Sequence, residues 1–486
     1  MDDLKKKGFR AFIWDFSGKL ANQGVGLVVT IFLARLLEPA EFGVVAIVMV
    51  VVGIANIFSD IGLGASLIQR RRLHPVHFSS VFYFNVSVGL FLSMVIFFAA
   101  PWISRFYHND QLLLLMQVMS VSFVLNAFSS VQKIRLRKEL NYALLAKIAF
   151  VSSSLSGIIG VCLAFAGAGV WSLVVQMLSM NIIGNIILWR AARWHPSLLF
   201  SWKALTQLWA FGSRMFLVQL LDVIYTRMDY LIIGKIFDAA TLGFYQRAKA
   251  LNQMAASYTS DSLMSVLFPV LSTIKNDLQR FQKVILKSLH LLSFVTFFIY
   301  LILYLEAGEL IVFIFGSQWV DSIQYFEILA IGAFVYPLNI LMISVLPSRG
   351  NSKKHLQMAV IKKTLLFSNL YIGFQFGIFG FLYGLIFIRI INTYITIFVV
   401  AKEISLPQSV FIKPIVLQGI IGFLSLGGTL IFINEYDILN YVFLTKIIIF
   451  SVLYFLLSAL IYRENLDIFY SEFNEHFQKI KKRFQG

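Results

Sequence analysis

Long apolar runs, separated by short polar connections, recur along nearly the whole chain. A helix that crosses the roughly 30 Å apolar core of a bilayer takes about 20 residues. Two of the segments counted as spans, 209–234 and 241–272, are too polar for hydropathy alone to identify. With these two segments included, the pattern predicts fourteen membrane-spanning helices, at residues 13–35, 40–62, 79–100, 113–132, 146–166, 170–190, 209–234, 241–272, 284–305, 323–346, 358–377, 380–401, 414–433 and 439–462.

The two polar spans are supported by an internal repeat. Arg35-Leu-Leu-Glu-Pro-Ala-Glu-Phe-Gly43 returns as Lys235-Ile-Phe-Asp-Ala-Ala-Thr-Leu-Gly243, and the cation Lys19 returns as Arg214. Each copy is typical of a long apolar helix, a short acidic turn that closes at glycine, and a second helix. Internal repeats of this kind are common in transporters. The repeat therefore predicts two related halves that meet near residue 200.

These elements predict an all-α polytopic membrane protein with two related bundles around a central cavity. The expected parts are an N-terminal bundle (1–200), a C-terminal bundle (201–401), two additional spans (402–462) and a cytoplasmic tail (463–486). Apolar tail residues step by three or four positions and a basic cluster follows them, which favours an amphipathic helix on the membrane surface. Docking against another cytoplasmic helix of the same protein is the alternative.

Composition and charge agree with a chain that lies in lipid. Apolar residues make up 59% of it and charged residues only 13%, whereas soluble domains carry about 25% charged residues. Lys and Arg cluster at every second connection, while the alternate connections hold only Arg35, Arg105 and Lys235. This asymmetry is the positive-inside pattern, so both termini are expected in the cytoplasm. It also explains the net charge of +17 without a nucleic-acid partner.

The sequence offers little for enzyme chemistry. The single cysteine, Cys162, excludes an intrachain disulfide. His74 and His77 lie in a basic turn without nearby carboxylates, so no metal site is expected there. No glycine-rich phosphate loop or nucleophile elbow occurs. We therefore expect neither a catalytic residue nor a cofactor, and we leave open coupling to a proton or sodium gradient.

The informative residues are ionisable groups inside predicted spans. Each costs roughly 2.5–3.5 kcal/mol at a helix centre, so such groups are expected to face a wet cavity or a partner. Lys19 and Gln23 share one helix face, as do Lys249 and Gln253. We predict a cavity in which substrate is bound by Lys19, Gln23, Arg214, Lys249, Gln253 and Arg389. The candidate counter-ions or coupling groups are Asp222, Asp229, Asp261 and Asp60.

Structural roles are the alternative for each of these residues. Lys19 and Arg214 lie near the predicted inner face, where a long side chain can reach the headgroups. Lys249 and Arg389 lie deeper and are harder to explain in that way. The aspartates could neutralise these cations without taking part in transport.

Several motifs resemble those of Wzx-type polysaccharide and O-antigen flippases of the MOP superfamily, on the branch with the colanic acid exporter. They occur in the order of that family between about residues 14 and 400, and the last two spans carry none. The matching stretches are Ala34-Arg-Leu-Leu-Glu-Pro-Ala-Glu-Phe-Gly43, Ser59-Asp-Ile-Gly-Leu-Gly-Ala-Ser-Leu-Ile-Gln-Arg70, Arg137-Lys-Glu-Leu140, Gly243-Phe-Tyr245, Leu267-Phe-Pro-Val270, Phe315-Gly-Ser-Gln-Trp319 and Leu346-Pro-Ser-Arg-Gly350.

The resemblance implies a protein of the bacterial inner membrane that moves an undecaprenyl-pyrophosphate-linked oligosaccharide from the cytoplasmic to the outer leaflet. It implies two bundles that rock around a cationic cavity. The expected partners are this substrate, membrane lipids, and a polysaccharide polymerase with its chain-length machinery. Cations in such a cavity would offset the phosphate charge.

Three alternatives remain at this stage. A lipid II flippase would share the reaction class. A cation-coupled multidrug antiporter would need carboxylates to dominate its cavity, whereas cations outnumber acids at depth here. A membrane polysaccharide polymerase or ligase would be expected to carry carboxylates in an external cleft.

The predicted topology can be tested by cysteine labelling in a variant that lacks Cys162. Cysteines at Ser352 and Ser201 should be shielded from an impermeant thiol reagent added outside, whereas a cysteine at Ser317 should react. Labelling of position 352 from outside would contradict the fourteen-span topology.

Overall fold

The computed structural model describes residues 2–60, 62–70, 73–192, 194–256, 262–435 and 442–463. Over these ranges the protein consists of helices and short connections, without a strand. Eleven of the described helical segments are long and apolar enough to cross a membrane. The predicted all-α fold of a multi-pass membrane protein is thereby confirmed.

The three other predicted spans, 209–234, 241–272 and 358–377, are also helical where they are described. They are not among the eleven, which comprise described residues only, and parts of all three segments lie outside that set. Charged residues such as Arg227, Asp229 and Lys362 lie within them. The internal repeat, rather than hydropathy, predicted the first two of these helices.

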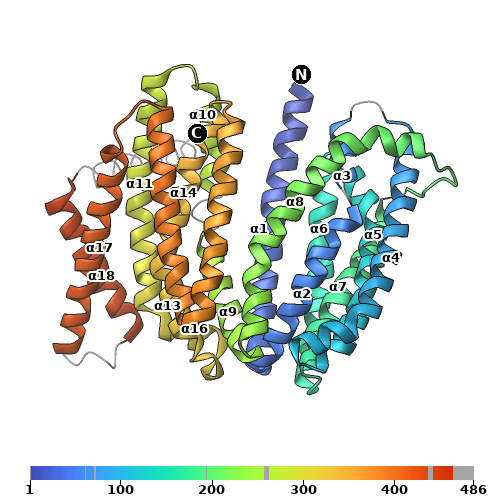
Figure 1. Cartoon of the computed structure of the whole chain (residues 1–486), viewed down its shortest axis with the longest axis horizontal. Coiled ribbons are helices and arrows are strands. Elements are labelled where there is room, and N and C mark those ends of the chain that lie inside the picture. Colours follow the sequence, from blue (N-terminus) through green and yellow to red (C-terminus); the bar gives the residue numbers. More distant parts are fainter. Residues whose placement is uncertain are drawn as a thin grey trace, which may run out of the picture. The chain divides into compact units, whose positions relative to one another are not determined.

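The chain forms two compact units, Met1–Gln246 and Arg247–Gly486. The first, blue to green in Figure 1, contains α1 (Asp2–Leu36), α2 (Pro39–Asp60), α3 (Leu63–Gln69), α4 (Pro75–Tyr107), α5 (Gln111–Lys138), α6 (Tyr142–Phe165), α7 (Val170–Ala191), α8 (Trp202–Ile236) and the start of α9 (Ala239–Ala256).

The second unit, green to red in Figure 1, continues from α9 with further helices and one 3₁₀ turn. They are α10 (Ser262–Thr273), α11 (Leu278–Leu305), α12 (Ala307–Phe315), η2 (Ser317–Trp319), α13 (Ser322–Ala333), α14 (Val335–Ile343), α15 (Val345–Ser348), α16 (Ser352–Glu403), α17 (Ser409–Glu435) and α18 (Val442–Ile461).

Helix α8 belongs to the first unit because it packs against α2, α3 and α4. The sequence assigned this helix to the second half on the basis of the repeat. A repeat describes how two segments are related, whereas packing describes which segments lie together. The predicted domain limits near residues 200 and 401 stay predictions, and the predicted tail helix lies outside the described residues.

The two copies of the repeat have the same local structure. Helices α1 and α8 are both 35 residues long. They end at Leu36 and Ile236, and the helices that follow begin at Pro39 and Ala239. The predicted order of long helix, short turn and second helix is thus confirmed in both copies.

Matching glycines bring the starts of α2 and α9 into backbone contact. A Cβ atom at Gly43 would lie 1.7 Å from the carbonyl oxygen of Ala239, and one at Gly243 would lie 2.0 Å from that of Pro39. Both distances are far below any van der Waals contact. The two repeats therefore meet at equivalent positions, and the contact requires that neither position carries a side chain.

Helix α16 is a hairpin of two helices, as the spans predicted at 358–377 and 380–401 require. Gly377 interrupts it with φ 71° and ψ −168°, a conformation that favours glycine. The two arms pack together, because Asn369 Nδ2 donates a hydrogen bond to the carbonyl oxygen of Phe381 at 3.0 Å. Both predicted spans are therefore present.

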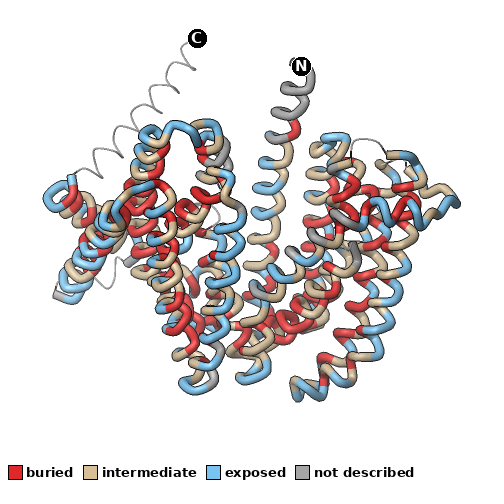
Figure 2. The backbone as a smooth tube through the Cα atoms, turned by 45° about the horizontal axis from the view of Figure 1, so that its top comes forward, coloured by how far each residue is buried: buried red, intermediate tan, exposed pale blue. Residues whose placement is uncertain are grey.

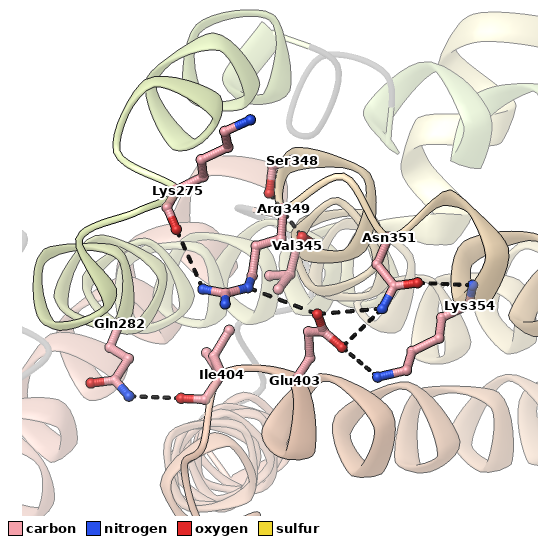
Figure 3. A network of polar contacts seen from close by, with 9 residues as sticks. All are labelled: Lys275, Gln282, Val345, Ser348, Arg349, Asn351, Lys354, Glu403 and Ile404. Carbon is pink, nitrogen blue, oxygen red and sulfur yellow. Dashed lines mark hydrogen bonds and ion pairs between the residues drawn. The ribbon is translucent and has the colours of Figure 1, made fainter.

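A carboxylate closes the open end of this hairpin (Figure 3). Glu403, at the end of the second arm, accepts hydrogen bonds from Lys354 Nζ at 2.6 Å and from Asn351 Nδ2 at 3.3 Å, both at the start of the first arm. Arg349 Nε lies 3.8 Å from Glu403. The Arg349 guanidinium also donates to the carbonyl oxygen of Lys275. One half-buried acid thus holds three basic or amide side chains together.

Buried and exposed residues alternate along the helices of each unit (Figure 2), and both sets include many large apolar side chains. On α4, Phe91, Phe98 and Trp102 are exposed, and Leu460 of α18 is too. In water such an exterior would be an aggregation hazard. In a bilayer it faces lipid tails, as expected for a multi-pass membrane protein.

We expect Gly43→Ala to lower the stability of the protein by about 1–3 kcal/mol, because its methyl group would collide with a backbone that cannot give way. Gly53→Ala is the matched control in the same helix, where a Cβ meets nothing within 4 Å. The control should be neutral or stabilising. Thermal unfolding in detergent measures both variants, and equal melting temperatures would contradict the close contact.

Candidate functional site

A polar cavity of about 330 Å³ lies within the first unit, between α1, α5, α6 and α7. Helix α1 packs against α6, α6 against α7, and α7 against α5, so the four helices enclose it. Its position is near the end of the unit that the charge pattern predicts to be cytoplasmic. Its polar lining residues are Asp15, Lys19, Asn22, Lys133, Arg137, Tyr142, Ser152, Asn181 and Asn185.

This cavity carries an excess of positive charge. Lys19 forms an ion pair with Asp15, one helical turn earlier on α1. Lys133 and Arg137, one turn apart on α5, form no ion pair with any described residue. A half-buried ammonium group without a counter-ion is unfavourable in a medium of low dielectric. An anionic ligand would supply the missing charge.

Amide groups complement these cations. The Nδ2 atom of Asn185 donates to the carbonyl oxygens of Leu125 and Asn181, each at 2.9 Å. The Oδ1 atoms of Asn22 and Asn185 are buried and have no hydrogen-bond partner among the described residues. Buried amide oxygens of this kind suit hydroxyl donors. The cavity therefore fits a ligand that combines an anionic group with hydroxyls.

The sequence analysis missed Lys133 and Arg137 as site residues. It ended the fourth span at residue 132 and assigned both cations to a cytoplasmic connection. Helix α5 instead continues to Lys138. Their spacing of four residues, directly after the apolar run, is the pattern that indicates a shared helix face.

Of the predicted substrate-binding residues in the first unit, Lys19 lines this cavity. Gln23 lies one turn further along α1 and is exposed. Arg214 lies on α8 and Asp60 on α2, but their side chains are outside the part of the chain that the structure describes. Whether these residues act together stays a prediction.

The two aspartates of α8 have different environments. Asp222 is exposed. Asp229 accepts a hydrogen bond from the hydroxyl of Tyr245, a buried residue at the start of α9. The rings of Tyr230 and Tyr245 lie 5.8 Å apart, so the contact joins α8 to α9 within the first unit. This gives Asp229 a structural partner, while its role in coupling stays a prediction.

The remaining predicted residues belong to the second unit. Lys249 is half-buried and Gln253 exposed, both on α9, and Asp261 lies outside the described residues. Arg389, on the second arm of α16, is half-buried. The first unit and the second are each described alone, so the predicted cavity shared by all these residues stays a prediction.

A polar network crosses the interior of the second unit near Arg389. Asn339 of α14 donates to Thr393 Oγ1 at 2.8 Å, and Asn339 Oδ1 accepts from Thr396 at 3.3 Å and from Lys362. The Thr393 hydroxyl also donates to the carbonyl oxygen of Arg389 at 2.9 Å, one turn earlier on the same helix. The sequence analysis did not identify Asn339, a lone amide in an apolar run, or Lys362, near the start of a predicted span, as site residues.

An apolar groove of about 630 Å³ lies beside this network, between α11, α14, α16 and α17. Thr393 belongs to both the groove and the network. Apart from this hydroxyl, the groove is lined by aliphatic and aromatic side chains, among them Phe297, Leu338, Tyr394, Ile415 and Phe423. The surface suits a hydrocarbon chain.

Membrane-length helices, an internal repeat and a cationic cavity among bilayer-embedded helices define a multi-spanning membrane transporter. The chain belongs to the polysaccharide biosynthesis protein family, whose model matches residues 32–324. This confirms the resemblance to Wzx-type flippases that the motifs indicated.

Two curated relatives are informative. The lipopolysaccharide biosynthesis protein WzxC of Escherichia coli is 22% identical over 408 residues, which cover 82% of each chain. The succinoglycan biosynthesis transport protein ExoT of Rhizobium meliloti is 25% identical over 320 residues, which cover 65% of this chain and 64% of the relative. Both names belong to polysaccharide biosynthesis.

Among solved structures, the fold is similar to that of the lipid II flippase MurJ in an inward closed conformation. The TM-score is 0.73 at 16% identity, and the match covers 93% of this chain and 100% of the other. At that identity the likeness concerns the fold alone. The MOP-type fold predicted from the sequence is confirmed.

If the cavity accepts a phosphorylated ligand, the purified protein should bind inorganic pyrophosphate. Lys133→Gln and Arg137→Gln should each weaken binding by about 1.5–3 kcal/mol, since each removes a charge-assisted contact; that is roughly tenfold or more in Kd. Isothermal titration in detergent measures the effect.

Arg190→Gln is the matched control, because Arg190 is an exposed cation at the same end of the unit and does not line the cavity. It should leave Kd unchanged. Equal weakening by all three substitutions would mean that general positive charge, rather than this cavity, attracts the anion.

Proposed function

We propose that the protein is a flippase that moves an undecaprenyl-pyrophosphate-linked oligosaccharide from the cytoplasmic to the outer leaflet of the inner membrane by alternating access. The observation that carries the proposal is the cavity of the first unit, in which Lys133 and Arg137 have no counter-ion among the described residues. A pyrophosphate would neutralise them. It cannot cross lipid tails unaided, because its charges would lose their hydration.

The sugar part of the substrate fits the same cavity. Its hydroxyl groups can donate to the free amide oxygens of Asn22 and Asn185. The cavity opens among α1, α5, α6 and α7 near their predicted cytoplasmic ends, where lipid-linked sugars are assembled. We infer that it receives the headgroup on that side.

The apolar groove of the second unit supports a lipid-linked substrate independently. A polyprenyl chain gains roughly 25 cal/mol for each Å² of apolar surface it buries. Phe297, Ile415 and Phe423 offer such a surface in a groove of about 630 Å³. A soluble sugar phosphate would make no use of it.

The family and the names of its members also support the proposal. WzxC is named for lipopolysaccharide biosynthesis and ExoT for succinoglycan transport. We propose the same kind of role here, with no catalytic step, with both termini in the cytoplasm, and with a polysaccharide polymerase and its chain-length machinery as neighbours. Coupling to a proton or sodium gradient is left to experiment.

Three other functions predict different outcomes. A lipid II flippase would restore growth to cells depleted of their own lipid II flippase. A multidrug antiporter would change drug susceptibility, although the cationic cavity disfavours the cationic drugs that such antiporters export. A polymerase or ligase would be dispensable for the arrival of single lipid-linked units at the outer leaflet.

The decisive measurement is the amount of lipid-linked oligosaccharide that an impermeant sugar-modifying enzyme reaches in intact spheroplasts. Loss of the protein should abolish the accessible pool while the total pool rises. Lys133→Arg should keep more transport than Lys133→Gln, and Lys133→Glu should be worst because it places negative charge beside pyrophosphate.

Arg214 provides a second series with the same expected order, Lys above Gln above Glu. Membrane abundance is measured in parallel for every variant. Normal transport by the Gln and Glu variants of Lys133, Arg137 and Arg214 at normal abundance would overturn the proposal that these cations line the path.

A further inference from the structure

Glu306 is a buried acid that the proposed function does not use. It joins α11 to α12, on the side of the second unit that the charge pattern predicts to be external. Its main chain is tied into both helices, because its N–H donates to Ile302 O at 2.9 Å and its carbonyl accepts from Leu310 N–H at 2.8 Å. The side chain is only 2% exposed.

Neither carboxylate oxygen of Glu306 has a hydrogen-bond partner among the described residues. An ionised carboxylate that is buried and without a hydrogen bond is strongly disfavoured. The ordinary solutions are a direct ion pair, a bound cation or a proton. Glu306 forms no ion pair with a described residue, so its immediate surroundings decide between the other two.

Two charged side chains act on Glu306. Glu309 lies one turn further along α12, and Lys446 comes from α18. Lys446 Nζ forms an ion pair with Glu309, and these two side chains are 17% and 33% exposed, respectively. The arrangement therefore holds two carboxylates for one ammonium group.

Other titratable groups also lie on the helices that pack here. Tyr304 of α11 lies close to Glu327 of α13. Asp321, before α13, is exposed. The connection at residues 436–441 lies outside the described residues, as does the side chain of Glu435. Among the described groups, Glu309 and Lys446 alone therefore set the charge environment of Glu306.

Charge balance favours a proton. With Lys446 engaged by Glu309, an ionised Glu306 would leave one uncompensated negative charge in a buried place. A proton on Glu306 makes the cluster neutral. In agreement, burial raises the pKa of Glu306 to about 7, with Lys446 opposing the shift and Glu309 adding to it.

We propose that Glu306 is a proton-binding site of the second unit and that its protonation controls the ion pair between Glu309 and Lys446. When Glu306 carries the proton, Lys446 pairs with Glu309 alone, and this ion pair joins α18 to α12. When Glu306 loses it, the two carboxylates compete for one ammonium group, and that ion pair weakens. The ligand is a proton from the external side.

A change in this ion pair would affect the apolar groove, because α18 packs against two helices that line the groove. Helix α18 packs against α17 and α11. Both of these helices contribute walls to the groove, through Ile415 and Phe423 of α17 and Phe297 of α11. External pH would thus act on the surface proposed to hold the lipid chain. The proton site itself does not depend on that proposal.

The sign of the effect follows from linkage. Glu306 has a higher pKa in the folded protein than in the unfolded chain, so its proton stabilises the fold at low pH. This contribution is complete below the unfolded value and disappears as pH rises through about 7. The melting temperature of the purified protein should therefore fall across that interval.

Three variants test the site. Glu306→Gln mimics the protonated acid, so it should remove this fall and be more stable than the parent above pH 7. Glu309→Gln leaves Lys446 to Glu306 alone, so the midpoint should move to lower pH. Lys446→Met removes the opposing charge, so the midpoint of the transition should move to higher pH. Both shifts should be about one pH unit or more.

Infrared difference spectroscopy during a pH titration observes the proton directly. A protonated-carboxyl C=O band should titrate near pH 7 in the parent and vanish in Glu306→Gln. The site would be overturned by a melting curve whose pH dependence survives in Glu306→Gln, by absence of the band, or by sodium ions at constant pH reproducing the stabilisation. None of these readouts depends on transport.

Discussion

A charge inside an apolar layer must find a partner, lose its charge or await a ligand, and the polar parts of this protein follow from that constraint. Glu403 is paired, because Lys354, Asn351 and Arg349 surround it. Glu306 has no such partner, and we infer that it is neutralised by a proton. Half-buried Lys133 and the exposed Arg137 beside it have no counter-ion among the described residues, which suits residues that bind an anion only in passing. A permanent counter-ion there would compete with substrate.

Close backbone contact is the second constraint. Gly43 and Gly243 allow α2 and α9 to touch at equivalent positions of the repeat. A contact between two backbones contains no flexible side chain that could adjust, so it fixes where the two helices start. The cavity of the first unit is lined by other positions, on α1, α5, α6 and α7. The residues that allow the close helix contact are therefore different from the residues that line the cavity.

Much of the fold could be predicted, because apolar runs and the repeat report directly on helices in lipid. The site was less predictable. The sequence analysis did not identify Lys133 and Arg137, because hydropathy shows where an apolar run ends and not where the helix ends. The sequence analysis did not identify Glu306, because a single acid in a short connection forms no recognisable sequence pattern. Only its burial in the structure distinguishes it. Asn339 and Lys362 come together from helices distant in sequence, so no local spacing could reveal them. Lys19 was found because the repeat singled it out.

The two candidate binding surfaces differ in what they can discriminate. Lys133 and Arg137 would contact phosphate, and the apolar groove would contact a hydrocarbon chain; both groups are common to all polyprenyl-linked sugars. Positive charge and apolar area attract such groups strongly but do not distinguish one sugar from another. Discrimination requires buried polar groups that are left unpaired by the wrong ligand. In the cavity these are the amide oxygens of Asn22 and Asn185. Affinity and selectivity would then reside in different residues of one cavity, so that a change of sugar needs new amides while the cations stay.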